Sequence, residues 1–159
     1  KYGRVDAVVT NTGHPPKGEI LAISDEDWHQ GLELLILPVA RMARLVTPVF
    51  EQQGSGAMVN ISTFSAFEPS PSFPVSSVLR AGLAGNTKFY AEAGIRMNNV
   101  LPDFMDNYPS SPEIVEKIPM KRYTKVQEVA KTARFLLSDD AGYITGENIR
   151  VGGGITRSV

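Results

Sequence analysis

The sequence contains no cysteine, which excludes disulfide bonds, thiolate catalysis and cysteine-based zinc sites. It has only two histidines, His14 and His29, without partners at a spacing typical of metal ligands, so we expect ordinary surface or loop residues. Basic residues form no long run and the net charge is −1, which argues against a nucleic-acid partner. The longest mostly apolar run, LELLILPVA, is too short to span a bilayer and contains Glu33 and Pro38.

The remaining composition is typical of a soluble globular protein, with 42% apolar and 21% charged residues. A chain of 159 residues is long enough for one domain with a core. The first residues, KYGRVD, are charged and do not resemble a signal peptide, so a cytoplasmic location is predicted.

Four short apolar runs alternate with helical patterns along the chain. The predicted strands are VDAVVTNTG, GAMVNIST, IRMNNVLPDF and ENIRVGGG. Helices are predicted over residues 25–53, capped by Ser24 and bent at Pro38, and over residues 76–91 and 111–118. A further helix, capped by Thr124, is predicted to end at Leu137. Alternation of this kind predicts an α/β fold, a Rossmann-like doubly wound parallel sheet.

The helix over residues 25–53 carries apolar residues on two sides. One stripe at helical spacing contains Leu32, Leu35, Val39, Met42, Val46 and Phe50, and a second contains Leu34, Leu37 and Leu45. One face can cover a sheet, and we expect the other to meet a partner subunit. On the last helix, the predicted buried side contains Val126, Val129, Ala130, Ala133 and Leu137.

Four segments in this order resemble the short-chain dehydrogenase/reductase family over essentially the whole chain. GRVDAVVTNTG is similar to its fourth strand and Asn-Asn-Ala-Gly turn, and GSGAMVNIST to its fifth strand. IRMNNVLPDF is similar to the sixth strand, with Asp103 where glycine is usual. SDDAGYITGENIRVGGG is similar to the C-terminal signature, with Gly152 where aspartate is usual.

The resemblance also implies parts that this sequence does not show. The family's first three strands, with the glycine-rich turn that binds the pyrophosphate of the cofactor, would precede Lys1. Without them the first strand here would be a bare hydrophobic edge. We therefore interpret residues 1–159 as a single domain, the later part of the fold in a longer chain. The connection near residues 92–94 is about one helical turn shorter than expected, which indicates missing residues there.

The resemblance implies an active site of Asn, Ser, Tyr and Lys, and this sequence departs from most of it. Counting along the chain puts Leu35 in the asparagine place and Thr63 in the serine place, with Ser62 as an alternative. Ser76 and Arg80 stand in the tyrosine and lysine places. Thr63 keeps a hydroxyl that can bind a carbonyl oxygen, whereas Leu35 is expected to be a core or interface residue. Arg80 stays cationic and can hold ribose hydroxyls or an anion, but it cannot relay a proton.

Ser76 is the decisive departure. An alcohol has a pKa near that of water, ~15.7, against ~10 for a phenol. The gap of about 5 units is worth roughly 7 kcal/mol, more than the roughly 3 to 5 kcal/mol that general acid–base catalysis supplies. Ser76 alone therefore does not replace the tyrosine. Tyr108, in the segment that covers substrate in the family, is the best substitute, with an exposed surface tyrosine as the alternative.

The positions that face the cofactor in the family match this sequence better than the catalytic positions do. Asn11 and Gly13 hold the turn beside the adenosine side, and Pro102, Phe104 and Met105 lie where main-chain groups contact the nicotinamide amide. Asp103 would place a negative side chain near the nicotinamide. The resemblance implies NAD or NADP as cofactor, and the residue that discriminates between them lies outside this sequence.

Three functions remain open on these grounds. The first is an NAD(P)-dependent oxidoreductase acting on a small-molecule alcohol or ketone with an altered proton donor. The second is a redox-silent structural or regulatory subunit. The third, ranked last, is a cofactor-free lyase similar to the halohydrin dehalogenases, which have arginine in the lysine place but retain the tyrosine that Ser76 replaces. In each case the two long helices are expected to pack across a twofold axis in a homodimer or homotetramer.

Overall fold

A four-stranded parallel sheet forms the centre of the computed structural model, which describes residues 2–92 and 95–158. The strands are β1 (Ala7–Asn11), β2 (Ala57–Ile61), β3 (Arg96–Pro102) and β4 (Asn148–Val151), and they lie in the order β1-β2-β3-β4. All three neighbouring pairs are parallel, so each connection crosses over the sheet. The predicted α/β class and parallel sheet are confirmed.

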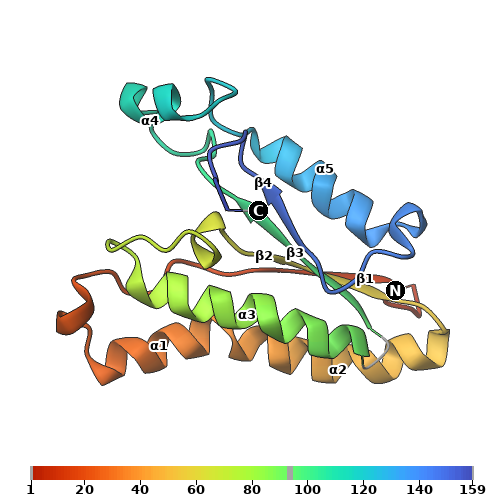
Figure 1. The fold of residues 1–159 in the computed structure, drawn as a ribbon. Helices are drawn as coiled ribbons and strands as arrows, with labels where there is room; N and C mark the ends of the chain where they lie inside the picture. The colour runs from red at the N-terminus through yellow and green to blue at the C-terminus, as the bar shows by residue number, and fades with distance from the viewer. Residues whose placement is uncertain (1, 93–94, 159) are drawn as a thin grey trace.

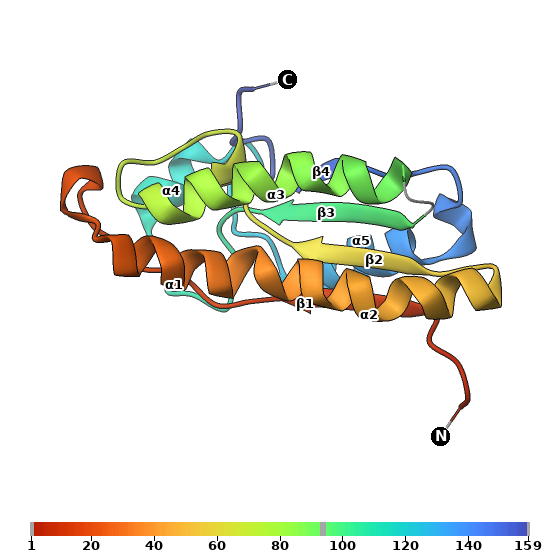
Figure 2. The ribbon, with the colours of Figure 1, turned by 90° about the horizontal axis from the view of Figure 1, so that it is seen from below.

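Helices cover both faces of this sheet (Figure 1). One face carries α1 (Asp25–Leu35), α2 (Leu37–Gln53) and α3 (Pro74–Glu92), and the other carries α5 (Val126–Leu137). Seen from below, α1 and α2 run beside α3 (Figure 2). The short α4 (Pro112–Lys117) lies beyond the sheet. Single 3-10 turns are η1 (Ile20–Ala22), η2 (Phe64–Ala66) and η3 (Asp139–Ala141).

The predicted long helix over residues 25–53 is two helices that meet at Ile36. Pro38 lies in the first turn of α2 and has no N–H to donate to the carbonyl of Leu34, which explains the interruption. The predicted start is confirmed: the main-chain N–H of Asp27 donates to Ser24 Oγ at 3.1 Å, and that of Ser24 donates to Asp27 Oδ2 at 3.2 Å.

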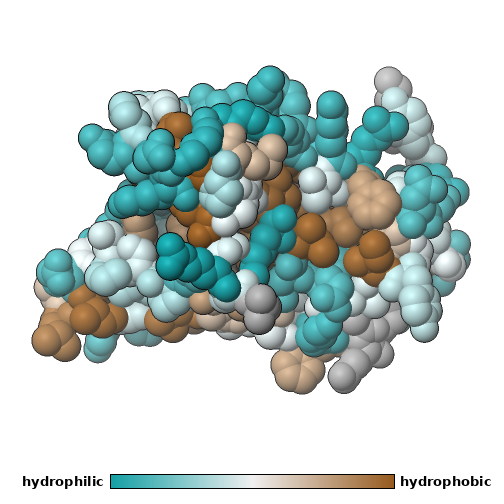
Figure 3. Space-filling view, turned by 45° about the horizontal axis from the view of Figure 1, so that its top comes forward, coloured by the Kyte–Doolittle hydropathy of each residue, from teal (hydrophilic) through white to brown (hydrophobic). Residues whose placement is uncertain are grey.

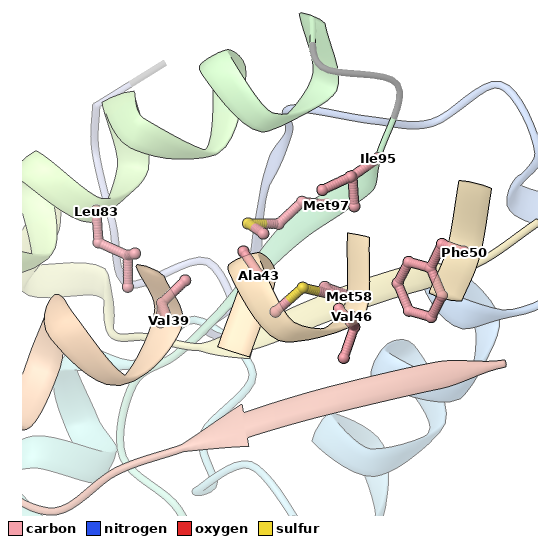
Figure 4. Packing of buried hydrophobic residues seen from close by; sticks show 8 residues of the cluster. All are labelled: Val39, Ala43, Val46, Phe50, Met58, Leu83, Ile95 and Met97. Carbon is pink, nitrogen blue, oxygen red and sulfur yellow. The ribbon is translucent and has the colours of Figure 1, made fainter. Parts of the chain in front are cut away.

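The larger hydrophobic cluster lies between the sheet and α2 and α3 (Figure 4). Its buried residues are Val39, Ala43, Val46, Phe50, Met58, Leu83, Ile95 and Met97. They come from both strands and helices, so the two layers share one core. Two residues of the stripe that was predicted to be apolar and buried, Leu32 and Met42, are each 36% exposed in the structure.

A second cluster lies under α5 and consists of Val59, Val100, Val129, Ala133 and Leu136. Here the predicted buried side was partly wrong, because Val126 and Ala130 are exposed and Leu136 is more buried than Leu137. Val126 and Ala130 line an open hollow beside the edge strand β1, so nothing in the described chain covers them.

Gly31 allows α1 to approach α3 closely. A Cβ at this position would lie 2.4 Å from Val75 Cγ1 and 2.9 Å from Leu79 Cδ1. Real Cβ atoms do not approach other heavy atoms so closely, so a larger residue would push the helices apart. This contact sets the position of the first turns of α3 relative to α1.

A ladder of polar side chains crosses the sheet beneath α3. Thr10, Asn60, Asn99 and Asn148 are register partners on successive strands. Thr10 Oγ1 donates to Asn60 Oδ1 at 2.6 Å, and Asn60 Nδ2 donates to Asn99 Oδ1 at 2.8 Å. Asn99 Nδ2 donates to Asn148 Oδ1 at 2.7 Å and to Thr87 Oγ1 of α3 at 2.9 Å. Because these groups satisfy one another, a polar layer is stable inside the core.

The N-terminus of α5 differs from the prediction. Thr124 does not cap it, since the Thr124 hydroxyl lies within hydrogen-bonding distance of Asp103 Oδ1 and the carbonyl oxygen of Val151. Instead, Glu128 accepts from the main-chain N–H of Lys125, and Asp106 Oδ1 accepts from that of Val126. The segment after β3 is thereby joined to the start of α5.

Over residues 2–92 and 95–158, no helix is long and apolar enough to cross a membrane. Nor do any three acidic or histidine side chains in those ranges lie close enough together to hold a metal ion. The predicted short connection near residues 92–94 involves residues 93–94, which lie outside the described part of the chain.

Candidate active site at the carboxyl edge of the sheet

The carboxyl ends of the parallel strands bring most of the predicted site residues to one edge. Gly13 follows β1, Thr63 follows β2, and Phe104 and Met105 follow β3. The N-terminal end of α3 points to the same edge (Figure 1). In open α/β sheets, ligands bind in the crevice outside these strand ends. Hydrophobic atoms also gather in the middle of the face shown in Figure 3, with hydrophilic atoms around them.

Arg80 of α3 joins the ends of two strands. Its Nη1 donates to the carbonyl oxygen of Ile61 at 3.2 Å and its Nη2 to that of Gly13 at 3.4 Å. The residue is only 6% exposed, and its Nε is buried without a partner among the described residues. Burial lowers the pKa of the guanidinium from its ordinary value, but an arginine remains protonated in proteins. A fixed cation with one unused N–H donor therefore stands at this edge.

Two hydroxyl groups are unused nearby. Thr63 is half-buried in extended backbone before η2, and its side chain makes no capping hydrogen bond. Ser76, in the first turn of α3, is also half-buried, and no described residue accepts from or donates to its hydroxyl. The alternative, Ser62, is 7% exposed and therefore less accessible. Thr63 and Ser76 are thus the hydroxyls that a ligand at this edge could reach.

Asp103 lies against the end of β4. Its Oδ1 accepts from Thr124 Oγ1 at 3.1 Å, and its Oδ2 is buried without a described partner. A Cβ on Gly152 would lie 3.3 Å from that Oδ2, so a side chain at residue 152 would crowd the carboxylate. Burial raises the pKa of Asp103, partly offset by the bond from Thr124. The sequence predicts this carboxylate near the nicotinamide, and the structure shows it in contact with Thr124 and close to Gly152.

An aromatic row holds the segment after β3 in place. The rings of Phe64 and Phe104 lie 5.9 Å apart, and those of Phe104 and Tyr123 lie 5.6 Å apart. Tyr123 is 8% exposed, and its hydroxyl accepts from the main-chain N–H of Ser111 at 3.1 Å. Met105 pairs with Thr124 as an isolated parallel bridge. The predicted Phe104 and Met105 therefore anchor this segment on η2 and on the start of α5.

Tyr108 is half-exposed and contacts His14. Its hydroxyl lies 2.8 Å from His14 Nε2, and the two rings meet edge to face at 6.1 Å. Sequence reasoning treated His14 as an ordinary loop residue and missed this contact, because no motif connects positions 94 apart.

Two of the positions expected to face a cofactor line the same hollow. Asn11, at the exposed end of β1, and Met105 both line a hollow of about 710 Å³ between β1 and α5. The carbonyl of Gly13 is held by Arg80, and Pro102 is buried at the end of β3. Leu35, in the asparagine place, is 1% exposed, in agreement with its expected core role.

Comparison with known proteins gives consistent matches over nearly the whole chain. The family model described as "Enoyl-(Acyl carrier protein) reductase" matches residues 1–156. A 3-oxoacyl-[acyl-carrier-protein] reductase FabG of Thermotoga maritima is 32% identical over 98% of this chain and 68% of its own length. The human dehydrogenase/reductase SDR family member 4 is 32% identical over 96% of this chain and 60% of its own.

Two solved structures are similar throughout. YwfH, an NADPH-dependent reductase involved in bacilysin biosynthesis, superposes with a TM-score of 0.89 at 25% identity, covering 99% of this chain and 69% of its own. The NADH-dependent reductase A1-R', responsible for alginate metabolism, has a TM-score of 0.85 at 26% identity, covering 98% and 66%. The chain thus spans between 60% and 69% of the lengths of these four relatives.

Proposed function

Because this chain belongs to the short-chain dehydrogenase/reductase family, we propose that it forms part of an NAD(P)-dependent oxidoreductase. The reaction is hydride transfer between the cofactor and the carbonyl carbon of a small-molecule ketone, or its reverse on the alcohol. The observation that carries the proposal is the cation of Arg80, fixed between the ends of β1 and β2 with its Nε unused.

The residues at the carboxyl edge fit a nicotinamide dinucleotide. The guanidinium of Arg80 supplies a fixed positive charge at this edge, which suits an anionic cofactor and its ribose hydroxyls. Asn11 and Gly13 would hold the adenosine side, and Pro102, Phe104 and Met105 would contact the nicotinamide amide through main-chain groups. The Asp103 carboxylate is held beside Gly152 by its bond from Thr124. When bound, this cofactor supplies or accepts the hydride.

The substrate oxygen needs a hydrogen bond and a proton. Thr63 is proposed to donate to the carbonyl oxygen, because its hydroxyl is half-buried and makes no bond of its own. Ser76 can add a second hydrogen bond at the same oxygen, but an alcohol is too weak an acid to release the proton. Tyr108 carries a phenol on the adjacent segment and is proposed to be the proton donor.

Association through the helical face is proposed as well. Leu45 is 70% exposed on α2, and Val78 and Phe89 are 55% and 69% exposed on α3. These residues belong to helices that lie side by side on the same face of the sheet (Figure 2). Burial of such side chains against a second copy across a twofold axis would remove apolar area from water. A homodimer or homotetramer is the expected state.

Calorimetric titration of the full-length protein with NADH and NADPH tests the function. We expect saturable binding of at least one of them, abolished in Arg80→Met and retained in Lys88→Met. Lys88 is the matched control, because it is an exposed cation on the same helix, paired with Glu147 at 2.7 Å. No binding by the wild type at millimolar cofactor would overturn the oxidoreductase and favour the redox-silent subunit.

A further inference from the structure

The contact between His14 and Tyr108 joins two segments that are distant in sequence. His14 lies in the connection between β1 and α1, and Tyr108 lies in the segment after β3. The His14 Nε2 and the Tyr108 hydroxyl oxygen are 2.8 Å apart, a normal hydrogen-bond length, and the rings also make an edge contact. Both residues lie just beyond the strand ends where the other site residues meet.

Main-chain contacts next to His14 and at Tyr108 fix the two loops that carry these side chains. Gly13, immediately before His14, has its carbonyl bound by Arg80, and Pro15, immediately after it, is buried. The main-chain N–H of Tyr108 donates to the carbonyl of Met105 at 3.1 Å, which closes a tight turn. The same turn contains Asp106, which accepts from the start of α5. The two side chains are therefore brought together by fixed loop geometry.

The chemistry of the two groups is complementary. A phenol is about 5 units more acidic than an alcohol, so Tyr108 can release a proton that Ser76 cannot. An imidazole has two ring nitrogens, so it can accept a proton at one and donate one from the other. Tyr108 is 48% exposed and His14 is exposed, so solvent reaches the pair. A phenolate left behind by proton donation can thus be reprotonated through the imidazole.

We propose that His14 and Tyr108 are a proton-donating pair that replaces the missing tyrosine of the family, an inference that rests on the proposed function. Tyr108 would give its proton to the carbonyl oxygen, where the π pair of the C=O bond forms the new O–H bond, while a bound reduced cofactor would supply the hydride to the carbonyl carbon. The protonated imidazole of His14 then returns a proton to the Tyr108 oxygen and regains one from water. The net reaction consumes one reduced cofactor, one proton and one ketone, and releases oxidised cofactor and alcohol.

The first test needs no cofactor. Imidazole ¹⁵N NMR of the full-length protein resolves the ring-nitrogen signals of its histidines, and His14→Gln and His29→Gln assign those of His14 and His29. His29 is the matched control, because its Nδ1 lies 2.8 Å from the main-chain oxygen of Asp25. Tyr108→Phe removes only the hydroxyl and should shift the signals of His14 and leave those of His29 unchanged. Unchanged His14 signals would show that the pair does not exist in solution and would overturn the inference.

The second test separates proton transfer from a structural contact. Tyr108→Phe should lower turnover by about 10²- to 10⁴-fold, the usual contribution of a general acid. His14→Gln keeps an amide able to bond Tyr108 but cannot relay protons, so kcat should fall while cofactor affinity stays within about twofold of wild type. Free imidazole should restore part of the turnover of His14→Ala, which a structural role would not allow. His29→Gln should keep wild-type turnover.

The outcomes distinguish the two proposals. A wild type that binds cofactor and reduces ketones, with Tyr108→Phe or His14→Gln equally fast, overturns the pair and leaves the proposed function standing. A wild type that binds neither cofactor overturns the proposed function and, with it, the pair. Full activity of His14→Gln and loss in Tyr108→Phe would assign the proton to Tyr108 alone and remove His14 from the relay.

Discussion

Replacing Asn99 by leucine tests the polar ladder that crosses the sheet. Asn99 is fully buried, and leucine is similar in size, so packing is nearly preserved while three side-chain hydrogen bonds are lost. The partners Asn60, Thr87 and Asn148 remain in place. The change therefore isolates the energetic value of polar satisfaction from that of volume.

The magnitude follows from what each partner retains. Asn60 is 1% exposed, and in the variant its Nδ2 has no acceptor. A buried donor left without a partner lowers the free energy of unfolding by about 1–3 kcal/mol. Thr87 keeps its bond to the carbonyl of Leu83, and Asn148 is half-buried, so water can reach it. Together these losses amount to about 3 kcal/mol. For a chain of this size that corresponds to a Tm lower by roughly 6–12 °C.

Urea unfolding of the full-length protein, followed by tryptophan fluorescence, measures the effect, and residues 1–159 contribute Trp28 to that signal. Thr10→Val is the matched control, because it removes one ladder bond and leaves a single buried atom, Asn60 Oδ1, without its donor, so it should cost less than Asn99→Leu. A loss below about 1 kcal/mol for Asn99→Leu, or a loss equal to that of Thr10→Val, would refute the ladder as a stabilising element.

Three further changes have defined outcomes. Gly31→Ala should lower the free energy of unfolding in urea by about 1–3 kcal/mol, because the new methyl group meets Val75. Gly82→Ala is the control, because a Cβ there meets nothing within 4 Å, and it should be neutral or stabilising. Equal effects of the two changes would contradict this packing. Burial raises the pKa of Asp103, so its charge destabilises the folded state above that pKa and ceases to do so as pH falls toward the unfolded value of 3.8. Asp103→Asn should therefore raise Tm at pH 7 more than at pH 4, and an equal change at both would be inconsistent with a buried charge. Leu45→Glu should reduce the mass measured by light scattering to that of a monomer, and a wild type already monomeric would exclude the proposed interface.

Much of the fold could be predicted because its signals are local. Each strand is a short apolar run, and Ser24 with Asp27 marks the start of α1 through a capping box that spans three residues. The predictions failed where a residue distant in sequence determines the local hydrogen bonding. Thr124 has the chemistry of a helix cap, but Asp103 and Val151 compete for its hydroxyl, and Asp106 caps α5 instead.

The site was less predictable, because its parts meet only in three dimensions. Asp103 stands where the family usually has glycine, and Gly152 where it usually has aspartate. Nothing in the sequence shows that these two changes are related. In the folded chain the carboxylate of one occupies space that a side chain on the other would need. The contact between His14 and Tyr108 is similar, since no periodicity or spacing connects a loop histidine to a loop tyrosine across two strands and the helices between them.

Arg80 ties α3 to two strand ends at the carboxyl edge, because it binds the carbonyl beyond β1 and the carbonyl at the end of β2. Residues 103–124 meet this arrangement through the Phe64–Phe104 ring contact and the His14–Tyr108 bond. Neither contact involves the two carbonyls that Arg80 binds. Residues 103–124 could therefore be exchanged as one continuous stretch while those two hydrogen bonds stay in place.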